Sequence, residues 1–380
     1  MAYHVPCVGA DKEAIAARIR ARGLHSILLC APENVYYTSG LPTVQGSGNP
    51  ILFALKNQLP PCVSIGADGK TTLFCWVGAT LGFTFDVDDV RSFFNYSSAL
   101  DELQDFLATL PAGARVGVES TCPLYMTAKL AGQEQSGRDK SAPTAKMAII
   151  DDLLLEARLV KNEAEIALMR QAAAIVEETV SDIRAVVRPG ISRLWLIREA
   201  KRLMLARGAD GIGHTTIAFG ASNPEIAFDE MLAADQLVTL DLGAVVAGYV
   251  SDNRRLLYTG SVPESLRALH TTMCDIVGQV GQALRPGVPF ADLYALAADL
   301  YAAHNLPPFF INAGHSIGLQ TEEAWISFDS PHSVRPGMIL NIELYSAYED
   351  GSNIGDEETF LVTDADVVRL TLTDSSIQGV

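Results

Sequence analysis

Hydrophobic positions in the first third of the chain alternate between helical and strand periodicity. The amphipathic stretch 11–23 predicts a helix, and the apolar run 25–30 predicts a buried strand. Residues 62–76 hold two apolar segments around an Asp-Gly pair, which is typical of two strands joined by a tight turn. The other predicted elements of this region are a turn at 32–40, a helix at 99–110 and a strand at 114–120. This alternation is typical of an α/β domain.

A polar, turn-rich segment at 132–146 separates this region from a second one. We expect it to form an inter-domain loop, because it is rich in Gly, Ser and charged residues. A long helical pattern then covers 147–187. It is followed by a helix at 192–208, a helix pair at 263–304 and otherwise by strands. We therefore predict a mixed α/β (α+β) chain with two domains, 1–145 and 146–380.

The composition argues against several classes of protein. The 380 residues are 48% hydrophobic, yet no apolar run reaches the ~20 residues that span a bilayer, so we expect no membrane partner. The first residues show no secretory signal, and the six cysteines are scattered without a CxxC motif, which favours free thiols in the cytoplasm. The net charge of −17 leaves no basic stripe for phosphates and argues against a nucleic-acid partner.

Two acidic residues lie within one largely apolar stretch at 236–259, QLVTLDLGAVVAGYVSDNRRLLYT. The pattern predicts a β-hairpin with a tight turn at 246–247, and this turn makes Asp241 the cross-strand partner of Asp252. Their Cβ atoms would then lie roughly 4.5–5.5 Å apart on one face of the sheet. Two carboxylates at that separation are destabilising unless a cation lies between them.

A second acidic pair lies in a second predicted hairpin at 337–363, GMILNIELYSAYEDGSNIGDEETFLVT. Its Asp350-Gly351 pair is a strong turn signal. A turn at this pair brings Glu343 within one residue of direct opposition to Glu357. A second pair of carboxylates therefore faces inward.

These four carboxylates, together with His315 of GHSIGLQTEEAW, form a candidate metal site. An oxygen-rich set with one imidazole suits Mn²⁺, Fe²⁺, Co²⁺ or Zn²⁺ better than a thiolate site would. The set can also hold two ions ~3.5–4 Å apart with bridging carboxylates. A single Asp or Glu in a strand is more often a solvated residue or a turn cap. Two matched pairs inside apolar runs favour the metal site.

The order Asp, Asp, His, Glu, Glu resembles the pita-bread metallopeptidases, which include methionine aminopeptidase, aminopeptidase P and prolidase, with creatinase as a metal-free relative. The matching segments are VTLDLGAVVAGYVSDNRR, AGHSIGL, RPGMILNIE and GDEETFLVT. The helical segment LVKNEAEIALMRQAA is similar to the start of the family's catalytic domain, and LHSILLCAPENVYYTSG is similar to the N-terminal domain of creatinase and prolidase. The resemblance spans nearly the whole chain.

This resemblance implies a creatinase-like α/β domain at 1–145 and a pseudo-symmetric pita-bread catalytic domain at 146–380. It implies two divalent ions per chain, with Mn²⁺ favoured and Co²⁺, Fe²⁺ or Zn²⁺ compatible, and usually a homodimer. The implied metal ligands are Asp241, Asp252, His315, Glu343 and Glu357. Of these, Glu343 would also transfer a proton, and His315 and Glu343 form the catalytic pair.

The sequence departs from the family pattern around the substrate. The active peptidases usually have a second histidine seven positions after the first, and here that position is Glu322. Another family histidine normally precedes the first Asp ligand, whereas the loop 221–236 has none and Phe228 or a neighbour stands near its place. The family's Thr and Pro beside two ligands are replaced by Arg254 and Leu344. Loss of one oxyanion donor typically costs ~10²–10³ in rate. The absence of both histidines therefore indicates that the substrate pocket is altered.

Several residues are candidates for substrate contacts, each with an alternative. Glu322 can accept hydrogen bonds from a cationic group or lie at the rim of the site. His214 can replace a missing histidine, although a lone histidine in a strand is more often structural. Arg254 or Arg255 can hold a carboxylate or pair with the acidic surface. Tyr37 of the partner subunit can reach the site, as the resemblance implies, or Tyr37 packs in a core.

The function expected from these residues is a metal-dependent hydrolase that cleaves an amide C–N bond. The default substrate is a short peptide with proline second, as for aminopeptidase P or prolidase. The first alternative is a hydrolase or lyase of a small non-peptide substrate, such as a creatinase-like amide or amidine or a compatible solute, with Glu322 binding a positive group. The second alternative is a non-catalytic binding protein, and the five retained ligands argue against it.

Overall fold

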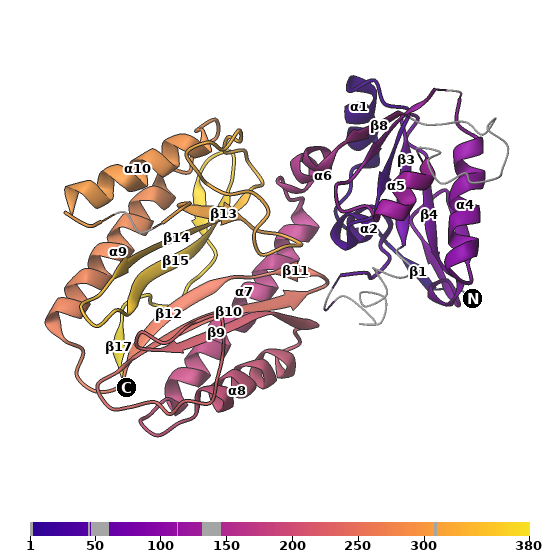
Figure 1. Ribbon diagram of the computed structural model, residues 1–380. Helices are drawn as coiled ribbons and strands as arrows, with labels where there is room; N and C mark the ends of the chain where they lie inside the picture. The colour runs from indigo at the N-terminus through magenta and orange to yellow at the C-terminus, as the bar shows by residue number, and fades with distance from the viewer. Residues whose placement is uncertain (1–2, 45, 47–60, 112, 131–145, 308–309) are drawn as a thin grey trace. The chain divides into compact units, whose positions relative to one another are not determined.

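The computed structural model describes residues 3–44, 46, 61–111, 113–130, 146–307 and 310–380. The chain divides into two compact units, Met1–Arg158 and Leu159–Val380 (Figure 1). The boundary thus falls later than the position 145/146 expected from the sequence. The inter-domain loop expected at 132–146 lies outside the described residues except for its last residue.

The described part of the N-terminal unit contains a six-stranded sheet with the order β6-β4-β3-β2-β7-β8. The strands of the unit are β1 (Tyr3–Val5), β2 (Ser26–Leu29), β3 (Cys62–Gly66), β4 (Thr71–Trp76), β5 (Phe83–Phe85), β6 (Asp89–Phe93), β7 (Arg115–Val118) and β8 (Lys146–Ile149). Its helices are α1 (Lys12–Ala21), α2 (Pro32–Ser39), α4 (Tyr96–Ala108), α5 (Leu124–Leu130), α6 (Asp151–Arg158) and the short 3₁₀ helix η2 (Val77–Ala79). A buried cluster that includes Phe74 and Leu103 packs α4 against the sheet.

The segment 32–40 forms helix α2, so the turn expected from its sequence is wrong. Pro32 stands in the first turn of the helix, where its missing N–H costs nothing. Gly40 ends the helix in the left-handed conformation with φ 79°. Val35 and Thr38 are fully buried, so tertiary packing stabilises a helix that the polar sequence of this segment does not predict.

The start of the expected helix at 147–187 is also different. Residues Lys146–Ile149 form β8, which pairs in parallel with β7. The following helix α6 packs against α1. Both elements therefore belong to the N-terminal unit, and this explains why the boundary falls after Arg158.

The C-terminal unit repeats one arrangement twice: two helices followed by antiparallel strands (Figure 1). The first half contains α7 (Glu163–Val186), α8 (Arg193–Ala206), β9 (Gly211–Phe219), β10 (Leu237–Val246), β11 (Tyr249–Val250) and β12 (Asn253–Tyr258). The second half contains α9 (Glu264–Gln282), α10 (Phe290–Ala303), β13 (Gly314–Ser316), β14 (Ile339–Ala347), β15 (Asn353–Val362) and β16 (Val367–Arg369), and the short strand β17 (Gln378–Gly379) pairs with β12. This repeat gives the unit a pseudo-symmetric architecture.

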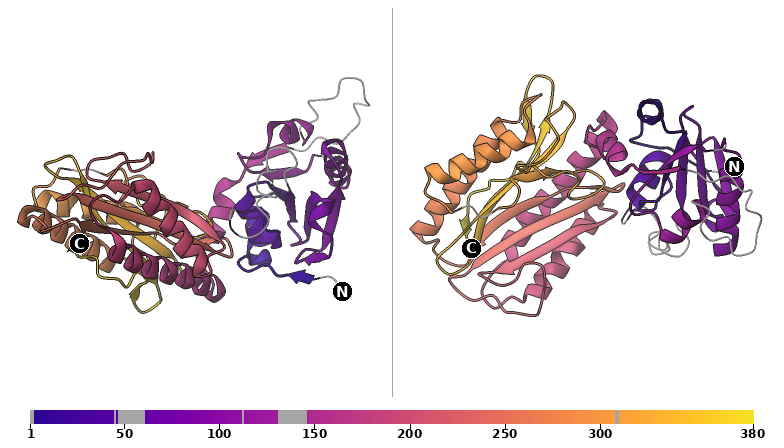
Figure 2. Two further views of the ribbon diagram at one scale, coloured as in Figure 1. Left: turned by 90° about the horizontal axis from the view of Figure 1, so that it is seen from below. Right: turned by 45° about the horizontal axis from the view of Figure 1, so that its top comes forward.

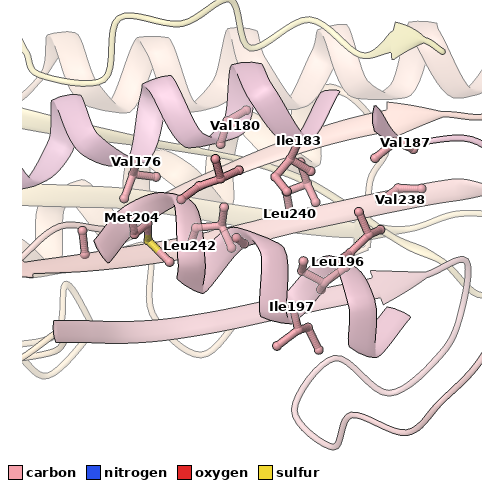
Figure 3. Close-up of a cluster of buried hydrophobic side chains, with 14 of the residues drawn as sticks. Val176, Val180, Ile183, Val187, Leu196, Ile197, Met204, Val238, Leu240 and Leu242 are labelled. Carbon is pink, nitrogen blue, oxygen red and sulfur yellow. The ribbon is translucent and has the colours of Figure 1, made fainter. Parts of the chain in front are cut away.

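Helices α7 and α8 cover one face of the first sheet, and α9 packs on β14 and β15 of the second (Figure 2). The apolar stripe of α7, with Val176, Val180 and Ile183, meets Leu240 and Leu242 of β10 (Figure 3). Side chains in a strand alternate between the faces, so Asp241 points away from these helices. The hydrophobic pattern of β10 thereby fixes the direction of its carboxylate.

The two sheets meet where β12 contacts β15. The buried Arg255 of β12 donates a hydrogen bond from Nη1 to the Glu357 carbonyl oxygen at 3.1 Å. Its Nη2 lies 3.3 Å from Oε1 of the buried Glu358. These contacts bring the acidic faces of the two hairpins together.

Across the described part of the chain, no helix combines the length and the hydrophobicity needed to span a membrane.

Candidate metal centre

The first hairpin has a turn one residue later than the sequence suggested. Val246 pairs with Tyr249 across the two-residue loop Ala247-Gly248, whose φ values are 45° and 83°. Asp241 therefore stands opposite Arg254 and not opposite Asp252, so the expected direct pairing is wrong. A shift of two positions keeps a side chain on the same face, because side chains alternate with a period of two. Both carboxylates consequently still face the same space.

The second hairpin differs by one residue from the register expected for a turn at Asp350-Gly351, because its loop 348–352 joins the paired residues Ala347 and Asn353. Glu343 of β14 lies directly opposite Glu357 of β15. One oxygen each from Glu343, Glu357 and Asp241 lies within 4.8 Å of the other two. The two hairpins thus contribute to a single acidic cluster.

His315 reaches the same cluster from β13, which pairs with β14. Its buried Nε2 lies 3.8 Å from Asp252 Oδ2 and 3.8 Å from Glu343 Oε2. Its Nδ1 lies 3.3 Å from the Ser316 carbonyl oxygen, which is an acceptor for an Nδ1–H. In the tautomer that carries its proton on Nδ1, the Nε2 lone pair is free to bind a metal ion. The structure therefore brings all five residues of the expected ligand set together.

The acidic cluster is electrostatically strained without a cation. Burial and the charges of Asp241 and Asp252 raise the pKa of Glu343 well above its usual range. Burial and the charges of Asp252 and Glu343 do the same to the pKa of Glu357. The Oε2 atom of Glu357 is buried and has no hydrogen-bond partner. An orphaned carboxylate oxygen among buried acidic groups fits a bound metal ion, so the residues present suit the expected cofactor.

His214 enters the cluster from β9, where it pairs with Gly243 of β10. Its Nε2 lies 2.8 Å from Asp241 Oδ1 and 3.0 Å from Asp252 Oδ1. Burial lowers the pKa of His214, but the charges of Asp252 and Asp241 outweigh burial and raise this pKa well above its ordinary value. The sequence proposed His214 as a substrate contact, and the structure places it against two of the expected metal ligands.

Arg254 also faces the cluster, whereas its neighbour Arg255 points to the opposite face. The Arg254 Nη1 lies 3.9 Å from Asp241 Oδ2. Its guanidinium lies 4.5 Å from the ring centroid of Tyr345, and its Nη2 donates to the Asn353 carbonyl oxygen at 3.1 Å. A fixed cation therefore lies beside the first Asp of the cluster.

The three other candidate residues have different positions. Glu322 is exposed, accepts a hydrogen bond from Trp325 Nε1 at 2.6 Å, and is near enough to contribute to the raised pKa of Glu343. Phe228 is 52% exposed and lies under the guanidinium of Arg193. Tyr37 is buried in the N-terminal unit, where its hydroxyl donates to the Ala157 carbonyl oxygen at 3.2 Å. Of the three, Glu322 has the clearest link to the cluster.

Two polar residues that orient the cluster were missed in the sequence. Asn341 Nδ2 donates to Glu357 Oε1, and Thr359 Oγ1 donates to Asn341 Oδ1 at 3.0 Å. The same hydroxyl lies 3.1 Å from the Asp252 carbonyl oxygen. Asn341 precedes Glu343 by two positions and Thr359 follows Glu357 by two, so the strand period could have placed both on the acidic face.

A buried ion pair supports the loop after His315. Lys161 Nζ lies 2.9 Å from Glu323 Oε2, and both side chains are almost fully excluded from solvent. Glu323 Oε1 also accepts from the Leu319 N–H at 3.3 Å. The two acidic residues of TEEAW therefore differ in their surroundings: Glu323 anchors the loop, and Glu322 is exposed.

Comparison with known proteins identifies the family. Residues 167–364 match the model of metallopeptidase family M24, and the chain belongs to this family. An uncharacterized peptidase of Bacillus subtilis, YqhT, is 28% identical over 245 residues, which cover 60% of this chain and 69% of that protein. A Xaa-Pro dipeptidase of Pyrococcus horikoshii is 25% identical over 285 residues, which cover 73% of this chain and 78% of that protein.

Solved structures show which fold the chain shares. The solved structure of a prolidase from Pyrococcus furiosus matches with a TM-score of 0.78 and 22% identity, covering 94% of this chain and 99% of that one. The expected mixed α/β fold with a pita-bread unit is confirmed. The protein is a metal-dependent peptidase, as the sequence indicated, and its family binds divalent metal ions.

Proposed function

We propose that this protein hydrolyses the amide bond of short peptides with proline in the second position, with two divalent ions per chain. The single observation that carries the proposal is the convergence of four carboxylates and His315 in one cluster. The Xaa-Pro dipeptidase of Pyrococcus horikoshii supports this substrate class. Mn²⁺ is the proposed ion, with Co²⁺, Fe²⁺ and Zn²⁺ compatible with the same donors.

In this proposal, Asp241, Asp252, His315, Glu343 and Glu357 hold the ions. Divalent ions supply Lewis acidity toward a carbonyl oxygen and toward water. Glu343 is also assigned to proton transfer, because a carboxylate beside the ions can accept a proton and return it during the reaction. Asn341 keeps Glu357 oriented through the hydrogen bond to its Oε1.

A second candidate function follows from Glu322. This exposed carboxylate stands at the position where active family members usually have a histidine, and its charge acts on Glu343. A carboxylate there favours a substrate with a positive group near the scissile bond. A small cationic amide or amidine is therefore the alternative to an Xaa-Pro peptide.

The test is a hydrolysis panel with metal-free protein and with protein reloaded with Mn²⁺. The panel contains Xaa-Pro dipeptides, Xaa-Pro-Yaa tripeptides, Xaa-Ala analogues and small amides with and without a positive group. Metal-dependent cleavage of the proline peptides, lost in Asp252→Asn and kept in the exposed control Asp364→Asn, is the expected result. Cleavage of the cationic amides alone, abolished by Glu322→Gln, would replace the first candidate with the second.

A further inference from the structure

We propose that His214 is a sixth metal-binding residue, which binds through Nε2 the ion held by Asp241 and Asp252. This inference rests on the proposed metal centre and adds a residue that the five-residue ligand pattern does not contain. The three side chains come from β9, β10 and the segment just before β12. Their donor atoms form one group within 4.8 Å of one another.

The distances are those of neighbouring ligands around one ion. His214 Nε2 lies 2.8 Å from one Asp241 oxygen and 3.0 Å from one Asp252 oxygen. Nitrogen and oxygen ligands bind such ions at about 2.0–2.2 Å, so two ligands at right angles are about 3 Å apart. His214 Nε2 therefore lies at the distance from the two carboxylates that is expected of a third ligand to the same ion.

The backbone leaves room for this imidazole. Gly243 lies opposite His214 in the ladder, and a Cβ on Gly243 would approach the ring atoms Cε1 and Nδ1 to 2.5 Å. Any larger residue at 243 would displace the ring from the carboxylates. The glycine therefore leaves the space in which the His214 ring lies against the cluster. A histidine that only filled space on the strand would not need a glycine opposite it.

The surroundings favour metal binding over a substrate contact. The His214 side chain is 22% exposed, and Nε2 is directed at two carboxylates and not outward. The Nδ1 atom is buried without a hydrogen-bond partner, so the support for the assignment comes from the two carboxylate contacts of Nε2. Within the same cluster, the orphaned Glu357 Oε2 offers a further donor atom.

The added imidazole changes the expected metal preference. Imidazole suits Zn²⁺, Fe²⁺ and Ni²⁺, whereas carboxylates suit Mn²⁺ and Mg²⁺. With His214 and His315 together, the centre has two nitrogen donors. Removing His214 is therefore expected to weaken Co²⁺ or Zn²⁺ binding more than Mn²⁺ binding.

The experiment measures metal affinity by calorimetry, with Co²⁺ and with Mn²⁺, and counts imidazole ligands by X-ray absorption of the Co²⁺-loaded full-length protein. The variants are His214→Ala and His214→Gln, since Gln keeps a hydrogen-bond donor for the two aspartates. His304→Ala is the matched control, because His304 is exposed at the end of α10. Circular dichroism establishes that each variant is folded.

The expected result is two ions in the wild type, with one of them weakened about 100-fold for Co²⁺ in both His214 variants, less for Mn²⁺, and one imidazole fewer by X-ray absorption. Wild-type affinity in His214→Gln, an unchanged imidazole count, or tighter binding in His214→Ala would overturn the assignment of His214. Absence of bound metal in the wild type itself would overturn the proposed function and this inference together.

Discussion

The buried Glu357 and the partly buried Glu343 contribute to the way the metal-free protein responds to pH. Their raised pKa values mean that the folded state binds more protons than the unfolded chain above the ordinary glutamate pKa. The free energy of unfolding therefore falls as pH rises through this window. The raised pKa of His214 acts in the same direction at higher pH. The lowered pKa of Asp252 acts only at lower pH, where its contribution to stability is lost as pH falls.

We therefore predict that chelator-treated protein has a lower melting temperature at pH 8 than at pH 6, and that Mn²⁺ raises the melting temperature more at pH 8. Thermal melts followed by circular dichroism measure both. The variant Glu357→Gln should make the dependence on pH less steep, because it removes one of the groups whose pKa is raised in the folded state. A melting temperature that rises with pH in the absence of metal would contradict this electrostatic account.

Individual residues also show what the sequence could and could not reveal. Glu343 and Glu357 were predictable as neighbours to within one residue from the Asp-Gly turn signal, whereas their exact register depends on the loop 348–352. The first hairpin turns at Ala247-Gly248, and Ala247 with φ 45° is an unusual residue for this conformation. His214 could not be assigned, because its role depends on a strand pairing between β9 and β10 that no local pattern specifies.

At the scale of elements, Arg255 connects the two hairpins. Its buried guanidinium donates to the Glu357 carbonyl oxygen and pairs with Glu358, whose pKa burial raises to about 7 despite the charge of Arg255. We predict that Arg255→Met lowers the free energy of unfolding by about 3 kcal/mol or more, because Glu358 loses its closest cation. Urea denaturation measures the change.

The double variant Arg255→Met/Glu358→Leu is the matched control, since it removes both charges. It should recover much of the lost stability, because a buried pair replaced by apolar groups is often tolerated. A double variant as unstable as the single one would show that Arg255 acts through its backbone contacts alone. Arg369, which lies 3.4 Å from Glu358 Oε1, is the remaining cation in either case.

Elements with strong periodicity were predictable, and those fixed by tertiary contacts were not. The stripe of α7 and the apolar alternation of β10 follow from local patterns, and they meet in one core. Helix α2 is different, because its burial in the N-terminal unit outweighs the turn-forming residues in PENVYYTSG. Strand β8 is short and mostly exposed, so its pairing with β7 defines it.

At the scale of the whole molecule, the C-terminal unit Leu159–Val380 contains the five proposed ligand residues and its own hydrophobic core. We predict that this unit, expressed alone, unfolds cooperatively and binds Mn²⁺ with an affinity close to that of the full chain. Thermal melting and calorimetry measure these properties. A unit that fails to melt cooperatively would show that residues before 159 are needed for its core.

The expected homodimer belongs to the same scale and stays a prediction. It comes from the resemblance to two-domain family members and has no signature of its own in the sequence. Light scattering of the full-length protein measures the assembly directly. A monomer would exclude a role for Tyr37 of the partner subunit, in line with the burial of Tyr37 in its own N-terminal unit.

The central claim is that the acidic cluster holds metal ions. The most direct measurement is the metal content of purified wild-type protein and of Asp252→Asn by mass spectrometry after loading with Mn²⁺ or Co²⁺. Asp252 is buried, and its carboxylate lies close to both His214 and His315. Two ions per chain are expected in the wild type, with a clear loss in the variant. A wild-type protein without bound metal would contradict the central claim.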